Sequence, residues 1–419
     1  MNLTAPRGTQ DILPPWTTAW QWLERKFQES CELYQYQEIR IPTFEHTELF
    51  QRGVGASTDV VQKEMYTFED KAGRSLTLRP EGTAGTVRSY IDNGLASQPS
   101  PVKLYYQLTA FRYEKMQKGR YREFHQMGCE CIGSAEATAD AELISLLSHY
   151  FNALGLSEIQ LKLNSIGCPK CRPIFRQKLM DYLRPHLAEL CEDCKQRFEQ
   201  NPMRILDCKQ ERCAEIAEEA PAPLDYLCDD CREHWESLKA LLEAANIPYQ
   251  VDRRIVRGLD YYTRTVFEYV SSHVGTQGTI CGGGRYDGLV EEVGGQPTPA
   301  VGFAMGVERL LLEAEGQKIE LPQPAVPQIF VAAFPETQQQ AFTLCAKLRA
   351  EGLRAALDIC GRSMKAQLKY ANRMRADYLL LLGADELAKN CAKIKKMSDG
   401  SEVQVHLDEL ASVLRSLEV

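Results

Sequence analysis

The sequence contains no apolar run long enough to cross a membrane. Its longest apolar stretches, such as the one that ends in Leu379-Leu380-Leu381-Leu382, fall well short of the ~20 residues that a spanning helix needs. The first residues, Met1 to Arg7, contain no apolar segment of the kind found in secretory signal peptides. We therefore expect a cytoplasmic protein with no membrane partner.

Two nucleotide-binding patterns are also missing. The sequence contains neither GxxxxGK[ST] nor a GxGxxG that follows a strand. A bound nucleotide would therefore need side chains to hold its phosphates, and the planar guanidinium of arginine suits phosphate oxygens. Positive charge is not in excess either, because the formal net charge is -8. Nucleic-acid-binding domains are usually basic, but a local basic face is enough to hold phosphates, so the charge leaves an RNA partner open.

The 419 residues are too many for one compact core. From Ser75 to Gly133, short apolar runs alternate with polar, glycine-containing turns, which favours antiparallel strands over βαβ units. Between about 168 and 250, cysteines and acidic residues dominate and helical periodicity returns, which indicates a mainly helical insertion. Beyond the proline-rich linker Leu321 to Pro327, strand-like and helical runs alternate.

These patterns predict an α+β protein. Residues 1–325 would form an antiparallel sheet core flanked by helices, with the cysteine-rich insertion 168–250 inside it. Residues 326–419 would form a separate α/β domain with a largely parallel sheet.

Two arginines are candidates for holding phosphates. Arg112 lies at the end of an apparent strand, and Arg309 lies where small residues would let a helix begin close to a ligand. Each alone is more often a surface ion-pair partner. Together with their surroundings they are more specific. Phe111-Arg112-Tyr113-Glu114, with Gly119-Arg120 in the following loop, resembles motif 2 of the class II aminoacyl-tRNA synthetases, and Gly302 to Arg309 resembles motif 3.

That resemblance implies a nucleotide site and a dimer. In the family, the motif 2 arginine holds the α-phosphate of ATP and the motif 3 arginine holds the γ-phosphate, which implies these roles for Arg112 and Arg309. Glu114 and Arg120 fall where the family contacts adenine and the phosphate tail, and Mg²⁺ is expected to bridge the phosphates. Pro42 takes the place of the motif 1 proline at the family's dimer interface, which implies a homodimer.

Two further segments indicate the amino acid. Arg257 to Glu268 and Gly282 to Asp287 resemble the two histidine-specific motifs of the histidyl-tRNA synthetases, and Thr77 to Thr83 and Gly119 to Gln126 also match that family. The resemblance covers nearly the whole chain. It implies a ligase that activates L-histidine with ATP to histidyl-adenylate and pyrophosphate, and then transfers histidine to the 3' end of its tRNA. The C-terminal α/β domain would bind the anticodon.

Two other functions are compatible with parts of this pattern. Bacteria have a non-catalytic paralogue of the synthetase that serves as a regulatory subunit in histidine biosynthesis, but it loses parts of the histidine-specific motif and the C-terminal domain. Here Arg257 to Glu268 is intact, and residues 326–419 follow the linker. The same motif counts against a class II synthetase for another amino acid.

A pocket that selects histidine needs a polar partner for each of the two ring nitrogens of imidazole. We expect Glu130, which has apolar neighbours, to accept a hydrogen bond from one N–H, and the Tyr262 hydroxyl to serve the other nitrogen. A pocket that hydrogen-bonds its substrate rejects unbonded analogues strongly, because its own buried polar groups would be left unpaired.

The resemblance also assigns the groups around the reacting carboxylate. It implies that Arg257 bridges the histidine carboxylate and the α-phosphate, and so acts as the catalytic cation together with Arg112. The α-ammonium group needs acceptors, and the resemblance places Glu81, Thr83 and Gln126 there. Tyr261 and Tyr262 are also compatible with packing on the sheet, and packing accounts for Tyr261 better than for Tyr262. The remaining residues expected in the histidine site are Glu81, Gly82, Thr83, Gln126 and Tyr261.

Fifteen cysteines are many for a chain that we expect in the cytoplasm. Eight lie between Cys168 and Cys231, and the pairs Cys168-x-x-Cys171 and Cys191-x-x-Cys194 have zinc-ribbon-like spacing. The chemistry implied by the resemblance requires no zinc, however. A structural Zn²⁺ at these four cysteines is therefore an alternative that we do not favour over thiols packed in the core, and the sequence leaves the metal unknown.

Overall fold

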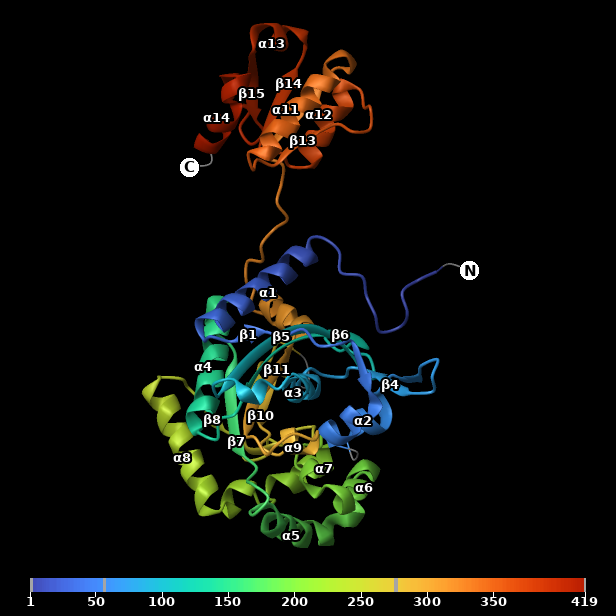
Figure 1. Ribbon diagram of the computed structural model, residues 1–419, viewed down its shortest axis with the longest axis vertical. Helices are drawn as coiled ribbons and strands as arrows, with labels where there is room; N and C mark the ends of the chain where they lie inside the picture. Colours follow the sequence, from blue (N-terminus) through green and yellow to red (C-terminus); the bar gives the residue numbers. More distant parts are fainter. Residues whose placement is uncertain (1–2, 56–57, 275–277, 418–419) are drawn as a thin grey trace. The chain divides into compact units, whose positions relative to one another are not determined.

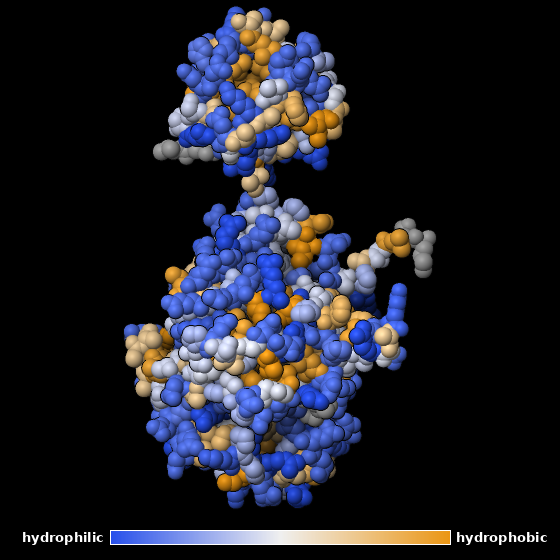
Figure 2. All heavy atoms as spheres, viewed as in Figure 1, coloured by the Kyte–Doolittle hydropathy of each residue, from blue (hydrophilic) through white to orange (hydrophobic). Residues whose placement is uncertain are grey.

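The computed structural model describes residues 3–55, 58–274 and 278–417. The chain divides into two compact units, Met1–Pro322 and Gln323–Val419 (Figure 1). On the face shown in Figure 2, polar side chains cover most of each unit, and apolar side chains gather in separate patches. Among the described residues, no helix is both long and apolar enough to cross a bilayer.

The N-terminal unit is built on an eight-stranded sheet. Its central strands are antiparallel to their neighbours, and only the short edge strands pair in parallel. Successive side chains of a strand point to opposite faces, so Val266 packs on one face while Phe267 and Tyr269 pack on the other. In order across the sheet, the strands are β1 (Gln37–Glu38), β5 (Val102–Phe111), β6 (Glu123–Ile132), β11 (Ala300–Gly306), β10 (Thr279–Arg285), β9 (Thr263–Val270), β7 (Gln160–Ser165) and β8 (Gln250–Val251).

Four helices contribute to the hydrophobic core on one face of this sheet. Their apolar residues recur every three or four positions, as Trp20, Leu23 and Phe27 do in the first of them, so that one stripe of each helix is buried. These helices are α1 (Trp16–Leu33), α4 (Ala137–Ala153), α8 (Asp229–Ala244) and α10 (Val307–Gly316).

The opposite face of the sheet has a second hydrophobic core. Helix α3 (Thr83–Asp92) buries Val87 and Tyr90 in the same core as Tyr262 and Tyr286. A small three-stranded sheet and short helices lie beside it (Figure 1). They are β2 (Phe44–His46), β3 (Thr67–Glu69), β4 (Ser75–Leu78), α2 (Thr47–Phe50) and α9 (Leu289–Glu292).

The predicted insertion lies between β7 and β8. These two strands are parallel neighbours, so the chain needs a crossover between them. Helices α5 (Arg172–Leu183), α6 (Glu192–Gln200) and α7 (Glu211–Glu218) lie together at one end of the unit, and α8 leads back to the sheet (Figure 1).

The C-terminal unit has its own five-stranded sheet and core. The three strands that carry the predicted alternation are parallel, but the last two add an antiparallel hairpin, so the sheet is mixed rather than largely parallel. The sheet order is β13 (Ala355–Leu357), β12 (Ile329–Ala333), β14 (Tyr378–Leu382), β15 (Cys391–Lys396) and β16 (Glu402–His406), and the helices are α11 (Gln338–Ala350), α12 (Met364–Arg373), α13 (Ala384–Lys389) and α14 (Leu410–Ser416).

The predicted fold class, a mixed α+β protein with a large sheet flanked by helices and a C-terminal domain, is confirmed. The hairpin was missed because Lys393 and Lys395 make β15 polar on one side, which is typical of an exposed edge region rather than of a buried strand.

Candidate active site

A cleft of about 470 Å³ opens over β6, β10 and β11. It is lined by the loop after β5, by the first turn of α10 and by the segment 256–259 before β9. The structure therefore brings together side chains from three segments that are far apart in the sequence. The predicted site residues that line the cleft are Arg112, Glu114, Arg120, Gln126, Arg257 and Arg309.

The motif 2 hairpin positions the first arginine. Nε of Arg112 donates to the carbonyl oxygen of Pro80 at 2.8 Å, and the guanidinium carbon lies 5.4 Å from the centroid of the Phe124 ring. Glu114 lies 3.7 Å from Arg112 and 3.2 Å from Arg120. These contacts fix a group of alternating charges at the mouth of the cleft, where an anion can replace the carboxylate as the partner of either arginine.

Arg309 lies on the first turn of α10, beside the loop that carries Gly119 and Arg120. Its guanidinium donates to the backbone oxygen of Thr279, which orients it towards β10. Burial and the neighbouring positive charge of Arg120 lower the pKa of Arg309. Because burial and Arg120 disfavour the positive charge of Arg309, a negatively charged ligand beside it would stabilise that charge.

Arg257 is fixed between a carboxylate and an aromatic ring. It forms an ion pair with Glu268 of β9, and its guanidinium carbon lies 5.7 Å from the centroid of the Tyr262 ring. Burial opposes the charge, but Glu268 and Tyr262 more than offset that effect and raise the pKa of Arg257. Nε of Arg257 has no hydrogen-bond partner among the described residues. A side chain at Gly282 would collide with this guanidinium, so the glycine run of β10 provides the space for it.

The second set of predicted residues does not line the cleft. Glu81, Gly82, Thr83, Glu130, Tyr261 and Tyr262 are all buried. They gather where α3 meets β6 and the start of β9. The structure thus separates the predicted site into an open cleft lined by arginines and a buried cluster of side chains around Glu130, which we call the glutamate pocket.

Glu130 is the centre of this buried cluster and is fully buried itself. Oε1 accepts from the Thr83 hydroxyl at 2.6 Å and from the Tyr106 hydroxyl at 3.2 Å, and Oε2 accepts from the Tyr286 hydroxyl. Burial raises the pKa of Glu130 to about 8, although the hydroxyl groups act in the opposite direction. Two carboxylate oxygens offer about four acceptor positions, so one position on Oε2 remains for another donor.

Glu81 caps the beginning of α3. Its two carboxylate oxygens accept from the backbone N–H groups of Thr83 at 2.7 Å and of Ala84 at 2.8 Å. An acidic group is favourable at this end of a helix because the first N–H groups have no partner within the helix. Burial nevertheless raises the pKa of Glu81. The Thr83 side chain faces Glu130, and a side chain at Gly82 would collide with the Tyr106 ring.

The tyrosine pair lies beside this pocket. The Tyr261 and Tyr262 rings are 4.6 Å apart, and the Tyr261 ring lies 5.5 Å from Tyr286 in an edge-to-face arrangement. Tyr262 contacts both halves of the site, because its ring also faces Arg257. In the cleft, the Gln126 side-chain oxygen is buried and has no hydrogen-bond partner among the described residues.

Several functional neighbours were not predicted from the sequence. Tyr106 and Tyr286 donate to Glu130, and Glu268 pairs with Arg257. Glu268 and Tyr286 lie inside the two histidine-specific segments, which was the available signal. Tyr106 had no such signal, because only the pairing of β5 with β6 brings it to Glu130.

The insertion also contributes to the cleft. Arg204, Asp207 and Lys209 are among its lining residues. Arg204 donates to the backbone oxygen of Arg257 at 3.1 Å, and Asn201 donates to the Asp260 carboxylate at 3.0 Å. The insertion therefore contacts the segment that carries the candidate catalytic arginine.

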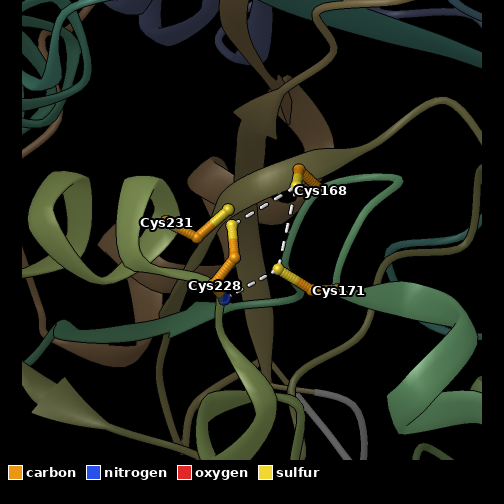
Figure 3. Close-up of side chains that lie close together, drawn as sticks. All are labelled: Cys168, Cys171, Cys228 and Cys231. Atoms are coloured by element: carbon orange, nitrogen blue, oxygen red, sulfur yellow. Dashed lines mark hydrogen bonds between the residues drawn. The ribbon is translucent and has the colours of Figure 1, made fainter.

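The four cysteines that the sequence offered as an alternative zinc site do not lie together. Cys168 and Cys171 join Cys228 and Cys231 in one group (Figure 3). Cys191 and Cys194 form a second group with two further cysteines, Cys208 and Cys213. The four cysteines of that alternative, Cys168, Cys171, Cys191 and Cys194, are thus divided between two groups, because helix α5 separates the first pair from the second.

The antiparallel sheet and the arginines that converge on its cleft define the core of a class II aminoacyl-tRNA synthetase, as predicted. A family model described as histidyl-tRNA synthetase matches residues 8–310, and an anticodon-binding domain model matches residues 328–417. The chain belongs to the histidyl-tRNA synthetase family.

Individual relatives agree over the full length. A histidine–tRNA ligase from Acetivibrio thermocellus is 56% identical over 416 residues, which cover 99% of this chain and 100% of the relative. The solved structure of apo S. aureus histidyl-tRNA synthetase is 37% identical with a TM-score of 0.85, and the match covers 99% of this chain and 100% of that chain.

The regulatory alternative has weaker support. A structure from Bacillus halodurans described as an ATP phosphoribosyltransferase regulatory subunit/histidyl-tRNA synthetase is 25% identical with a TM-score of 0.62, and the match covers 88% of this chain and 97% of that chain. The full-length match to histidine–tRNA ligases confirms the predicted class of enzyme, an aminoacyl-tRNA ligase.

Proposed function

We propose that this protein joins L-histidine to its tRNA in two steps at the cleft. In the first step, the histidine carboxylate attacks the α-phosphorus of ATP, and pyrophosphate leaves. In the second step, the histidyl group passes from the adenylate to the 3' end of the tRNA. The observation that carries this proposal is the convergence of Arg112, Arg257 and Arg309 on one cleft, with the glutamate pocket directly behind it.

ATP occupies the arginine side of the cleft in this proposal. Arg112 contacts the α-phosphate and Arg309 the γ-phosphate, while Glu114 and Arg120 hold the adenine and the phosphate tail. The lowered pKa of Arg309 favours a phosphate between it and Arg120. Mg²⁺ accompanies the phosphates and prefers oxygen ligands. The carboxylates of Glu114 and Glu268 line the cleft and are donors of this kind.

Histidine occupies the space between the cleft and the pocket. Its imidazole N–H donates to the remaining acceptor position of Glu130, and the Tyr262 hydroxyl serves the second ring nitrogen. The unpartnered oxygen of Gln126 and the carboxylate of Glu81 receive the α-ammonium group. Thr83 acts through Glu130, since its hydroxyl already donates to that carboxylate. Gly82 and Tyr261 shape the pocket by leaving room for Tyr106 and by packing on Tyr286.

Arg257 is the catalytic cation of the first step. Two anions must meet when the carboxylate approaches the α-phosphate, and a preorganised positive charge stabilises the charge that develops on the phosphoryl oxygens. Its Nε has no protein partner among the described residues and so can bind one of these anions. Glu268 holds the guanidinium in place.

The partners follow from the same function. The C-terminal unit, which matches the anticodon-binding model, binds the tRNA anticodon in this proposal. The homodimer forms through the segment at Pro42, whose carbonyl oxygen is held by Arg79 at 3.2 Å. Exposed aromatic rings at Phe44 and Phe68, 6.3 Å apart, offer apolar surface to a second copy. A cytoplasmic location stays a prediction.

Histidine-dependent exchange of pyrophosphate with ATP tests the first step directly. The full-length protein should catalyse exchange with histidine and with none of the other amino acids. Exchange with a different amino acid would contradict the choice of substrate, and no exchange with any amino acid would contradict the ligase itself.

A further inference from the structure

The eight cysteines of the insertion have the geometry of metal ligands. In each group of four, all sulfur atoms lie within 4.8 Å of one another. Four thiolates around one zinc ion lie at the corners of a tetrahedron, and a Zn–S distance of ~2.3 Å gives a sulfur–sulfur distance of about 3.8 Å. The observed distances are 3.7 Å for Cys168 to Cys171, 3.8 Å for Cys168 to Cys228, and 3.9 Å for Cys191 to Cys208. We propose that each group is a structural zinc site.

The first zinc site is formed by Cys168, Cys171, Cys228 and Cys231, whose side chains converge in Figure 3. The backbone N–H of Cys228 donates to the Cys171 sulfur at 3.1 Å. Such hydrogen bonds orient a metal-bound thiolate and disperse its charge. Cys168 and Cys171 lie at the beginning of the insertion, and Cys228 and Cys231 lie at the beginning of its last helix, α8. One ion would therefore link two segments that are far apart in the sequence.

The second zinc site repeats this arrangement with Cys191, Cys194, Cys208 and Cys213. The backbone N–H of Cys191 donates to the Cys213 sulfur at 3.2 Å. Cys194, Cys208 and Cys213 are buried, as structural zinc ligands are expected to be. An N–H to sulfur contact in each group is a second feature that thiols packed at random would not share.

Disulfides and iron–sulfur clusters fit the geometry less well. A disulfide needs a sulfur–sulfur distance of about 2.0 Å, and all fifteen cysteines are free. In a four-iron cluster each thiolate binds a different iron, so the sulfurs lie farther apart than around one ion. Tetrahedral sites with four cysteine ligands are typical of zinc.

The two sites hold opposite ends of the candidate catalytic segment. Arg172 follows Cys171 directly and donates to the backbone oxygen of Tyr262. Arg204 lies between Cys194 and Cys208 and donates to the backbone oxygen of Arg257 at 3.1 Å. We therefore assign the zinc sites a positioning role for residues 257–262, and this part rests on the proposed function.

Elemental analysis of the full-length protein, purified without chelator, tests the metal directly. We expect about two zinc ions per chain, from the two four-cysteine groups. One ion or fewer per chain overturns the two-site proposal, as does iron in place of zinc. Titration of thiols in denaturant distinguishes a disulfide, because each disulfide removes two of the fifteen free thiols. These measurements do not depend on any substrate, so they can fail while the ligase function holds.

Single variants assign the ions to their groups. Cys171→Ser and Cys213→Ser should each lower the zinc content to about one ion per chain, while Cys360→Ser, an exposed cysteine outside both groups, should leave it at about two. An unchanged content in both site variants overturns the assignment. If a variant fails to fold, a titration of the metal-free wild-type chain with Co²⁺ takes the place of that experiment. Two equivalents should then produce the intense absorption of tetrahedral thiolate coordination, and its absence overturns the sites.

Hydrogen exchange tests the positioning role. In Cys213→Ser, amides of the segment 257–262 should exchange faster than in the wild type, and the rate of adenylation should fall about tenfold while transfer from preformed adenylate changes little. Cys360→Ser should change neither. Loss of one zinc ion with unchanged exchange at 257–262 overturns the positioning role.

Discussion

The arginine-lined cleft and the glutamate pocket adjoin one another but differ in how their charge is controlled. In the cleft, arginine supplies the positive charge, and neighbouring groups orient the guanidinium groups of Arg112, Arg257 and Arg309. In the pocket, burial raises the pKa of Glu130 to about 8. A permanent charge suits a phosphate that is always anionic. A carboxyl group that titrates near neutral pH suits the recognition of a neutral imidazole ring, because hydrogen bonds and not net charge then select the amino acid.

The largest expected effect concerns the cleft and should appear in adenylate formation much more than in transfer to tRNA. Arg257→Ala should slow formation of the adenylate by roughly 10²–10³, as the loss of one preorganised donor typically does. Transfer from preformed adenylate should change much less, because the α-phosphate has already reacted. Single-turnover measurements of both steps provide the comparison.

The matched control for this variant is Arg253→Ala, which removes a half-exposed arginine paired with Asp225. It should change neither step, since exposed ion pairs contribute little. Equal slowing of both steps in Arg257→Ala would contradict the catalytic role.

The next expected effect separates the halves by substrate. Tyr262→Phe should raise the KM for histidine by about 10- to 100-fold, since an unpaired buried group costs about 1–3 kcal/mol. The KM for ATP should change little, because Tyr262 is not among the residues that line the cleft. Pyrophosphate exchange at varied histidine and ATP measures both constants, and equal rises in the two would show that the halves are not independent.

A pair of glycine substitutions tests each half by crowding it. A methyl group at Gly282 would collide with Arg257, and one at Gly302 would collide with Glu130. Overpacking costs about 1–3 kcal/mol, so we expect about a tenfold loss from each. Gly282→Ala should lower the rate of adenylation, whereas Gly302→Ala should raise the KM for histidine.

Gly288→Ala is the control for these two substitutions. A methyl group at Gly288 would lie 3.8 Å from its nearest neighbour, the Glu292 carboxylate, and so would not collide with it. It should leave both constants within about twofold of the wild type. The same kinetic change in Gly282→Ala and Gly302→Ala would argue against two separate halves.

The smallest effect concerns pH. Histidine donates an N–H to Glu130 in our proposal, and an ionised carboxylate is the better acceptor. The kcat/KM for histidine should therefore rise a few-fold as the pH increases through about 8, where Glu130 loses its proton. Glu130→Gln should remove that rise, and a rise that persists in the variant would assign it to another group.

Glu130→Gln should also change how the stability of the protein depends on pH. Folding raises the pKa of Glu130 from 4.5 to about 8, so its contribution to stability is complete below pH 4.5 and is lost as the pH rises through about 8. The side chain at this position in Glu130→Gln has no titratable group. The melting temperature of this variant relative to the wild type should increase between about pH 4.5 and pH 8 and change little above that range, whereas a constant difference would contradict the shifted pKa.

The sequence by itself identified Arg112, Arg257 and Arg309 among the residues that line the cleft. Arg112 and Arg309 each lie in a short local pattern, a strand followed by a tight loop and a glycine-rich helix start, and local patterns fix where such side chains point. The sheet core was predictable for the same reason, because the alternation of apolar and polar residues is a local property.

Only the tertiary structure decided the chemistry of the pocket and the grouping of the cysteines. The hydroxyls that satisfy Glu130 belong to residues 47, 24 and 156 positions away in the sequence. The pKa of a carboxyl group depends on its burial and on such distant partners, and no local pattern records either. Spacing alone joined Cys168 and Cys171 to Cys191 and Cys194, but it could not show that α5 holds these pairs apart and that α8 brings Cys228 and Cys231 back to the first pair.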